Sequence, residues 1–236
     1  MAIKEIIIEV MMTGSDFCRY IDNLSIGDDD RRVRYLSLFS AIIAVGDEHL
    51  TESAIGCLYE RGMDREALYE AILQSYLFLG FPRMIEAALA FNRVIGNMTG
   101  HCSLEAVTPE ESGEWFERGI NLCRRVYGKN YEVLRKRFLE VSPEIFRWMV
   151  IEGYGKVLCR PGMTHIEREL AEVAALIVDR RERQLVSHIL GSLNVGAEMP
   201  LIRIINRDIR PLAGETAHEL ANRVIRRIQE KYETQI

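Results

Sequence analysis

A glutamate, a histidine and an arginine that together suit acid chemistry lie in one stretch of the sequence, from Arg160 to Gly196. Glu169 and His188 are predicted to lie on two consecutive helices, with both side chains turned toward the interior of the helix pair. Histidine gives up a proton near neutral pH, and a carboxylate can orient or charge its imidazole. Arg160 has the planar donors that hold a carboxylate in a two-pronged contact. The three residue types therefore point to proton transfer on a bound acid.

Two helices are predicted to position these side chains. Thr164 and Glu167 form a capping box directly after a Pro-Gly break, so the first helix begins there. A charged turn over 179–183 separates it from the second helix, which ends at Gly196, a residue suited to the left-handed conformation. Apolar residues recur at helical spacing and define the buried faces: Leu170, Val173, Ala174 and Ile177 in the first helix, and Leu185, Ile189 and Leu193 in the second.

The rest of the chain is also predicted to be helical, because no Val-, Ile- and Thr-rich run alternates with period two. Gly80-Phe81-Pro82 should end a helix sharply. Helix starts are expected at Asp28, Asp29 or Asp30, at Asp64, at Thr108 and at Ser142. The chain is therefore predicted to be all-α, with a first unit at 1–97, a linker at 98–107 and a second unit at 108–236. Residues 1–27 are left without a predicted element.

Composition excludes several classes of function. The formal net charge of −5 argues against general binding to nucleic acid or to an anionic membrane. No apolar run is long enough to span a bilayer, and no secretory signal is visible. The five cysteines form no Cys-x-x-Cys pair, and their odd number is typical of reduced thiols in a cytoplasmic protein. The histidines show no metal-ligand spacing, so the sequence predicts no metal.

An internal repeat is indicated by matching residues at an offset of 134, the difference between Gly196 and Gly62. The same offset relates other residues without a gap, pairing Arg34 with Arg168, Leu36 with Leu170, Ile43 with Ile177 and Gly80 with Gly214. We therefore expect a duplicated four-helix unit. Arg160, Glu169 and His188 correspond to Ile26, Tyr35 and Ala54, so only the second unit carries the candidate site. Gly214 is not followed by Phe-Pro, so the second unit is expected to lack the sharp corner that Gly80-Phe81-Pro82 forms in the first unit. Pro200 and Pro211 are expected to interrupt the third helix of the second unit.

These residues carry a resemblance to a known family. Arg160-Pro161-Gly162, Arg168-Glu169-Leu170 and Ser187-His188-Ile189 resemble the carboxymuconolactone decarboxylase family, within the alkyl hydroperoxidase D-like superfamily. The resemblance covers about 105–236 as a complete unit and 30–97 as a truncated one. It implies an all-α fold that assembles into rings. Because two units are already joined in this chain, we expect a homotrimer.

The resemblance also constrains the chemistry. Decarboxylases of the family need no cofactor, whereas its peroxidases use two cysteines with a glutamate and a histidine. Glu169 and His188 match the glutamate and the histidine, but Arg181 and Gln184 occupy the cysteine positions. Without a thiolate there is no nucleophile for peroxide. Thiol peroxidase activity is therefore not expected at this site.

The resemblance implies a cofactor-independent lyase acting on a small organic, lactone-type acid. In this interpretation Arg160 holds the substrate carboxylate, His188 protonates the carbanion left by decarboxylation, and Glu169 orients or charges the imidazole. Simpler interpretations stay open. His188 would then be a hydrogen-bonded core residue, Glu169 a partner of Arg168 or Arg160, and Arg160 a solvated turn residue. The whole chain would in that case be a non-catalytic family member serving assembly or ligand binding.

Overall fold

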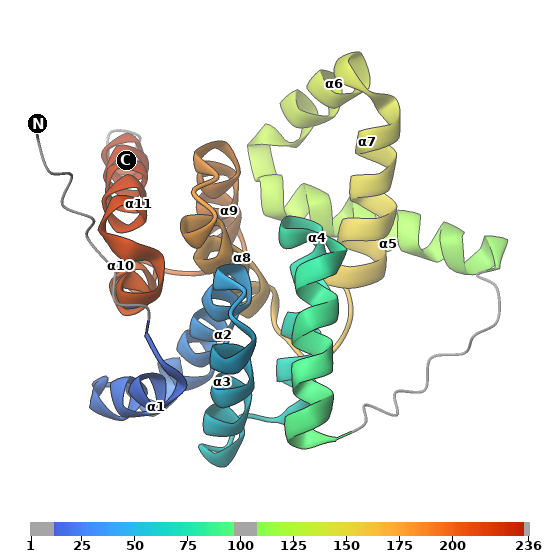
Figure 1. The fold of residues 1–236 in the computed structure, drawn as a ribbon. Coiled ribbons are helices and arrows are strands. Elements are labelled where there is room, and N and C mark those ends of the chain that lie inside the picture. Colours follow the sequence, from blue (N-terminus) through green and yellow to red (C-terminus); the bar gives the residue numbers. More distant parts are fainter. Residues whose placement is uncertain (1–11, 97–107, 234–236) are drawn as a thin grey trace, which may run out of the picture.

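The computed structural model describes residues 12–96 and 108–233, and every regular element in these residues is a helix (Figure 1). The predicted linker at 98–107 lies outside the described residues. The elements run in the order α1 (Gly14–Asn23), α2 (Asp28–Val45), α3 (Glu48–Glu60), α4 (Arg65–Ile95), α5 (Pro109–Tyr127), the 3-10 turn η1 (Gly128–Asn130), α6 (Tyr131–Val141), α7 (Pro143–Trp148), the π-helix η2 (Met149–Leu158), α8 (His165–Val178), α9 (Glu182–Asn194), α10 (Met199–Asp208) and α11 (Arg210–Glu233). The all-α prediction is confirmed for this part of the chain.

The predicted helix starts depend on side-chain caps, most of which are present. The hydroxyls of Thr108, Ser142 and Thr164 each accept a hydrogen bond from a backbone N–H of the helix that follows. Asp64 caps α4 in the same way. The start of α2 differs from the prediction, because Gly27 is its N-cap and the three aspartates lie inside the first turn. There the carboxylates favour the helix through its dipole instead of capping it.

Three elements were missed in whole or in part by the sequence analysis. Helix α1 begins with a capping box between Thr13 and Asp16 and buries Phe17 and Ile21. Helix α6 was also not predicted, and neither was the π-helical winding of η2, whose first residues, Met149 and Val150, were expected in the helix that begins at Ser142. The π-helix places Val150, Tyr154 and Val157 in the interior, and such wide turns have no simple local signal in a sequence.

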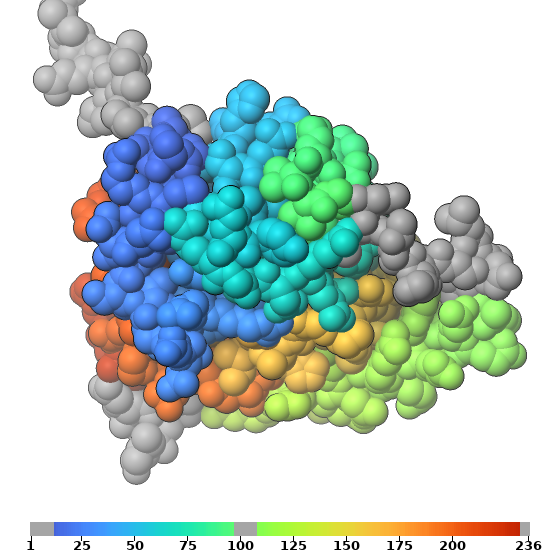
Figure 2. All heavy atoms as spheres, turned by 90° about the horizontal axis from the view of Figure 1, so that it is seen from below, coloured from blue at the N-terminus to red at the C-terminus, as the bar shows by residue number. Residues whose placement is uncertain are grey.

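The core has two parts. The larger part is formed by α1–α4 and α8–α11, with α2 packed directly against α8 at its centre. The smaller part is formed by α5–α7 and η2 around Leu122, Phe146 and Tyr154. Figure 1 shows α5–α7 together on one side of the molecule and α10 and α11 on the other. Figure 2 shows α1–α4 covering one face, with α5 along its edge, so segments far apart in sequence share one body.

Unusual backbone conformations recur at the offset of 134. Gly80 has φ 80° and ψ 166°, and Gly214, 134 residues later, has φ 75° and ψ 165°. Gly46 and Arg180, also 134 apart, both have positive φ, at 74° and 56°. The expected loss of the corner at Gly214 is therefore wrong: the turn at Gly80 is repeated there without the proline. Pro200 also does not interrupt a helix, because it lies in the first turn of α10, where no backbone donor is needed.

None of the helices in the two described ranges is both long enough and apolar enough to cross a membrane.

Candidate functional site

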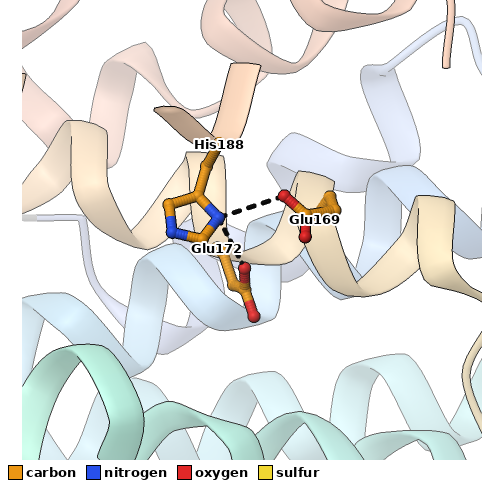
Figure 3. Close-up of side chains that lie close together, drawn as sticks. All are labelled: Glu169, Glu172 and His188. Atoms are coloured by element: carbon orange, nitrogen blue, oxygen red, sulfur yellow. Dashed lines mark hydrogen bonds and ion pairs between the residues drawn. The ribbon is translucent and has the colours of Figure 1, made fainter. Parts of the chain in front are cut away.

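Two carboxylates and an imidazole meet between α8 and α9 (Figure 3). Glu169 and Glu172 lie one turn apart on α8, and His188 extends from α9 between them. The Nδ1 atom of His188 lies 3.0 Å from Oε2 of Glu169 and 2.8 Å from Oε2 of Glu172. We call these three residues the Glu-Glu-His cluster. The prediction that Glu169 and His188 face the interior of the helix pair is confirmed, and Glu169 pairs with neither Arg168 nor Arg160.

The cluster is buried. Its residues are only 3% (Glu169), 1% (Glu172) and 7% (His188) exposed. Glu169 accepts a hydrogen bond from His188 when the hydrogen is on Nδ1. Both carboxylate oxygens of Glu172, in contrast, have no hydrogen-bond partner, although one of them lies at ion-pair distance from Nδ1. A single ring nitrogen with at most one hydrogen therefore faces two carboxylates.

The electrostatics of the cluster follow from this crowding. Burial disfavours the charged imidazolium, but the charges of Glu172 and Glu169 outweigh it and raise the pKa of His188 to about 10. Burial raises the pKa of Glu172 to about 7, and the nearby His188 charge lowers it only in part. The three groups together prefer positive charge between them.

His188 also lines a cavity of about 1090 Å³, which we call the His188 cavity. Aromatic side chains from five other elements form much of its wall: Phe78 (α4), Tyr127 (α5), Phe138 (α6), Trp148 (α7) and Tyr154 (η2). Phe78 packs against the imidazole of His188 in an edge-to-face arrangement, with the two ring centroids 5.0 Å apart. Glu169 and Glu172 are not among the lining residues, so they lie behind the imidazole as seen from the cavity.

Arg160, the predicted substrate-binding residue, is not brought to this place. Its Nε donates to both carboxylate oxygens of Glu70, at 2.9 and 3.1 Å, and it does not line the His188 cavity. Arg168 donates to the same carboxylate at 2.9 Å. Two arginines thus converge on a glutamate buried on α4, and Arg160 is part of the contact between the two halves of the chain. The arginines that line the cavity are Arg137, Arg183 and Arg227.

The sequence also predicted positions without reactive groups, namely the two cysteine positions of the family and the counterparts of the site residues in the first unit. Arg181 is exposed and pairs with Asp179 at 2.6 Å, and Gln184 lines the cavity, so neither position offers a thiol. In the first unit, Tyr35 and Ala54 are buried in the apolar core. The described part of that unit therefore has no equivalent of the cluster at these positions.

Glu172 is the functional candidate that the sequence analysis missed. It follows Glu169 by three residues, so the two carboxylates share one face of α8, and that face also carries the buried Val173 and Leu176. The sequence did contain a signal for Glu172. It lies at helical spacing from Glu169 on a helix that is apolar on most sides. Together the three residues offer one nitrogen and two oxygens within 4.8 Å of one another, which is a set of atoms able to hold a metal ion.

Comparisons with protein-family models and with curated proteins find no match to this chain.

Proposed function

We propose that the chain is a duplicated, alkyl hydroperoxidase D-like helical protein whose second unit acts as a carbon–carbon lyase on a small organic acid. The observation that carries the proposal is the position of His188, an imidazole in the wall of a large cavity with two buried carboxylates behind it. The resemblance of the surrounding residues to the carboxymuconolactone decarboxylase family supports it. The repeat of backbone conformations at one offset supports the duplication.

The geometry suits decarboxylation of an acid conjugated to a carbonyl or a lactone. In this reaction the bond to the carboxyl carbon breaks, CO2 leaves, and the electron pair moves into the conjugated carbonyl. A proton then joins the carbon. A hydrogen-bond donor beside the developing enolate oxygen lowers the barrier, and it acts most strongly where water is excluded. The second ring nitrogen of His188 points away from both carboxylates (Figure 3), so it is the atom available to the substrate.

Two residues of the cluster then have roles in this reaction. His188 is the catalytic residue, which donates a hydrogen bond to the enolate and is the proposed source of the proton. Glu169 is a positioning residue, since it fixes the imidazole through the contact at Nδ1. Apolar and aromatic walls favour the loss of a charged carboxylate as neutral CO2. Because Arg160 is bound to Glu70, we propose Arg183, on the same helix as His188, to hold the substrate carboxylate.

We also propose that the chain assembles, as a homotrimer. Large apolar side chains outside the His188 cavity are exposed along the second half of α4, with Phe81 at 59%, Ile85 at 50% and Leu89 at 52%. A row of exposed apolar groups on one helix is a candidate surface for contact with another chain. Two joined units per chain would allow three chains to form the closed ring that the family resemblance implies.

The direct test is CO2 release from a panel of unsaturated lactone acids. We expect turnover of at least one acid by the wild type, and a loss of about 100-fold or more in His188→Gln. Ser192→Ala is the matched control: Ser192 is buried one turn further along α9 and its hydroxyl bonds only to the carbonyl of Ile189 in the same helix. It should retain full activity. Turnover by His188→Gln at the wild-type rate, or none by the wild type on any acid, contradicts the proposal.

A further inference from the structure

We propose that Glu169, Glu172 and His188 bind a divalent first-row transition-metal ion between α8 and α9. The inference goes beyond the proposed lyase activity and does not depend on it, because it stands on the geometry of the cluster alone. Its ligands are one carboxylate oxygen from each glutamate and the Nδ1 atom of the histidine.

The distances within the cluster are those of ligands around one ion. Bonds from such ions to imidazole nitrogen and carboxylate oxygen measure about 2.0–2.2 Å, so two neighbouring ligand atoms at a right angle lie about 3 Å apart. The separations from Nδ1 to the two carboxylates are 3.0 Å and 2.8 Å. All three ligand atoms lie within 4.8 Å of one another. A small displacement of the side chains would open the centre to an ion.

Hydrogen bonding alone leaves the cluster incomplete. The one hydrogen on Nδ1 can be directed well at only one carboxylate, and Glu169 accepts it. Glu172 then keeps two oxygens without a hydrogen-bond partner although its side chain is fully buried. A buried carboxylate without partners is costly. A metal ion would give it a partner, because an ion binds several ligands at once whereas a proton bridges two atoms.

The net charge of the cluster also favours a divalent ion. When both glutamates are ionised they carry two negative charges, which a divalent ion balances with the imidazole neutral. In that state a protonated imidazole alone would leave one net negative charge in the interior. The nearest buried arginine on α8, Arg168, is already engaged with Glu70 and Gln74. The cluster therefore accepts a dication without help from its neighbours.

The ligand atoms select the class of ion. Magnesium and calcium prefer sites made only of oxygen, and copper(I) prefers sulfur, whereas a mixed set of one imidazole and two carboxylates suits Mn²⁺, Fe²⁺, Co²⁺ or Zn²⁺. Three protein ligands leave further coordination positions for water. The His188 cavity beside the cluster offers a route of entry.

An ion at Nδ1 would refine the chemistry of the site. It fixes the imidazole with its remaining hydrogen on Nε2, the nitrogen that points away from the carboxylates. His188 would then be a fixed hydrogen-bond donor toward the cavity.

Metal binding can be measured on the full chain without any substrate. The protein is treated with a chelator and titrated with Mn²⁺, Co²⁺ and Zn²⁺ by calorimetry, with melting temperature and the visible Co²⁺ spectrum as further readouts. We expect one ion per chain for at least one of these metals, a raised melting temperature, and a Co²⁺ spectrum typical of nitrogen and oxygen ligands. Glu172→Gln should weaken binding by about 100-fold or more, because it replaces a ligand.

A control variant and a measurement of melting separate loss of the metal site from other effects. Glu152→Gln changes a half-exposed carboxylate that lines the same cavity, and it should leave metal binding unchanged. Glu172→Gln should also melt at or above the metal-free wild type, since it removes a buried charge, so loss of binding will not reflect unfolding. A folded wild type that binds none of the three metals overturns the proposal. So does unchanged binding in Glu172→Gln, which would place the ion elsewhere.

Discussion

Arg34 and Asp208 form a buried ion pair that joins α2 to α10. The Nε atom of Arg34 donates to Oδ2 of Asp208 at 2.7 Å, and the two side chains are 4% and 1% exposed. The residues 134 positions away from each, Arg168 and Gln74, are also paired: Arg168 donates to the side-chain oxygen of Gln74 at 3.1 Å. An arginine of each half therefore reaches a side chain of the other half. This reciprocal exchange is what two similar units packed around a common axis would produce, and it supports the proposed duplication.

The two pairs should differ in their contribution to stability. Asp208→Asn keeps the shape of the side chain but leaves the charge of Arg34 buried without its counter-charge, and should lower the free energy of unfolding by about 3–5 kcal/mol. Gln74→Met removes hydrogen bonds but no charge, and Arg168 keeps its ion pair with Glu70, so this variant should cost about 1–3 kcal/mol. Urea unfolding of both variants measures the difference. Equal losses would show that the charge at Asp208 is not what matters.

The sequence predicted those features that depend on local chemistry. Thr164 with Glu167 placed the start of α8 correctly, and Gly80 placed a sharp corner, because caps and glycine turns are encoded within a few residues. The inward direction of Glu169 and His188 followed from helical periodicity. These predictions needed only the local sequence.

What the sequence analysis missed depends on distant contacts. Arg160 was expected at a substrate, yet its partner is Glu70, 90 residues earlier in the chain, and no local pattern reveals that pairing. The Glu-Glu-His cluster was also not predicted as a group, because only the spacing of histidines was considered. The cluster has a single histidine, with two glutamates from another helix.

Gly80 should be intolerant of any side chain. Its φ of 80° and ψ of 166° lie in a region that only glycine enters readily, so Gly80→Ala should destabilise the fold by about 1–3 kcal/mol. The strain comes from the backbone, since the added methyl group would meet only Pro82, at an ordinary 3.6 Å. Gly113→Ala is the control, because Gly113 lies in helix α5 without a positive φ and nothing lies near the added carbon. Denaturant unfolding in which both variants behave alike would refute the assignment of strain to Gly80.

Peroxide reduction driven by dithiols should not exceed the uncatalysed rate. Arg181 and Gln184 offer no thiol near the cluster, and burial raises the pKa of the Cys123 thiol to about 12, which suppresses its thiolate. A coupled assay that follows dithiol oxidation measures this. Turnover above background would mean that a cysteine reacts, and a Cys159→Ser variant would show whether it is Cys159.

The purified protein should have the mass of three chains in solution. The exposed apolar side chains on the second half of α4, Phe81, Ile85 and Leu89, supply the surface that a neighbouring chain would cover. Light scattering coupled to gel filtration measures the mass. A stable monomer would contradict the ring assembly, and a dimer would require a different arrangement of the two units.

Binding of a small acid in the His188 cavity tests the central claim most directly. The chain has two tryptophans, and Trp148 lines the cavity, so Trp115→Phe leaves Trp148 as the single fluorescent reporter. Titration of this variant with unsaturated lactone acids should give a saturable change in Trp148 emission for at least one acid. Adding His188→Gln should weaken that binding by about tenfold or more, because a hydrogen bond to the ligand is lost, while Ser192→Ala should leave it unchanged. No saturable change with any acid, or equal affinity after His188→Gln, would contradict the assignment of this cavity as the functional site.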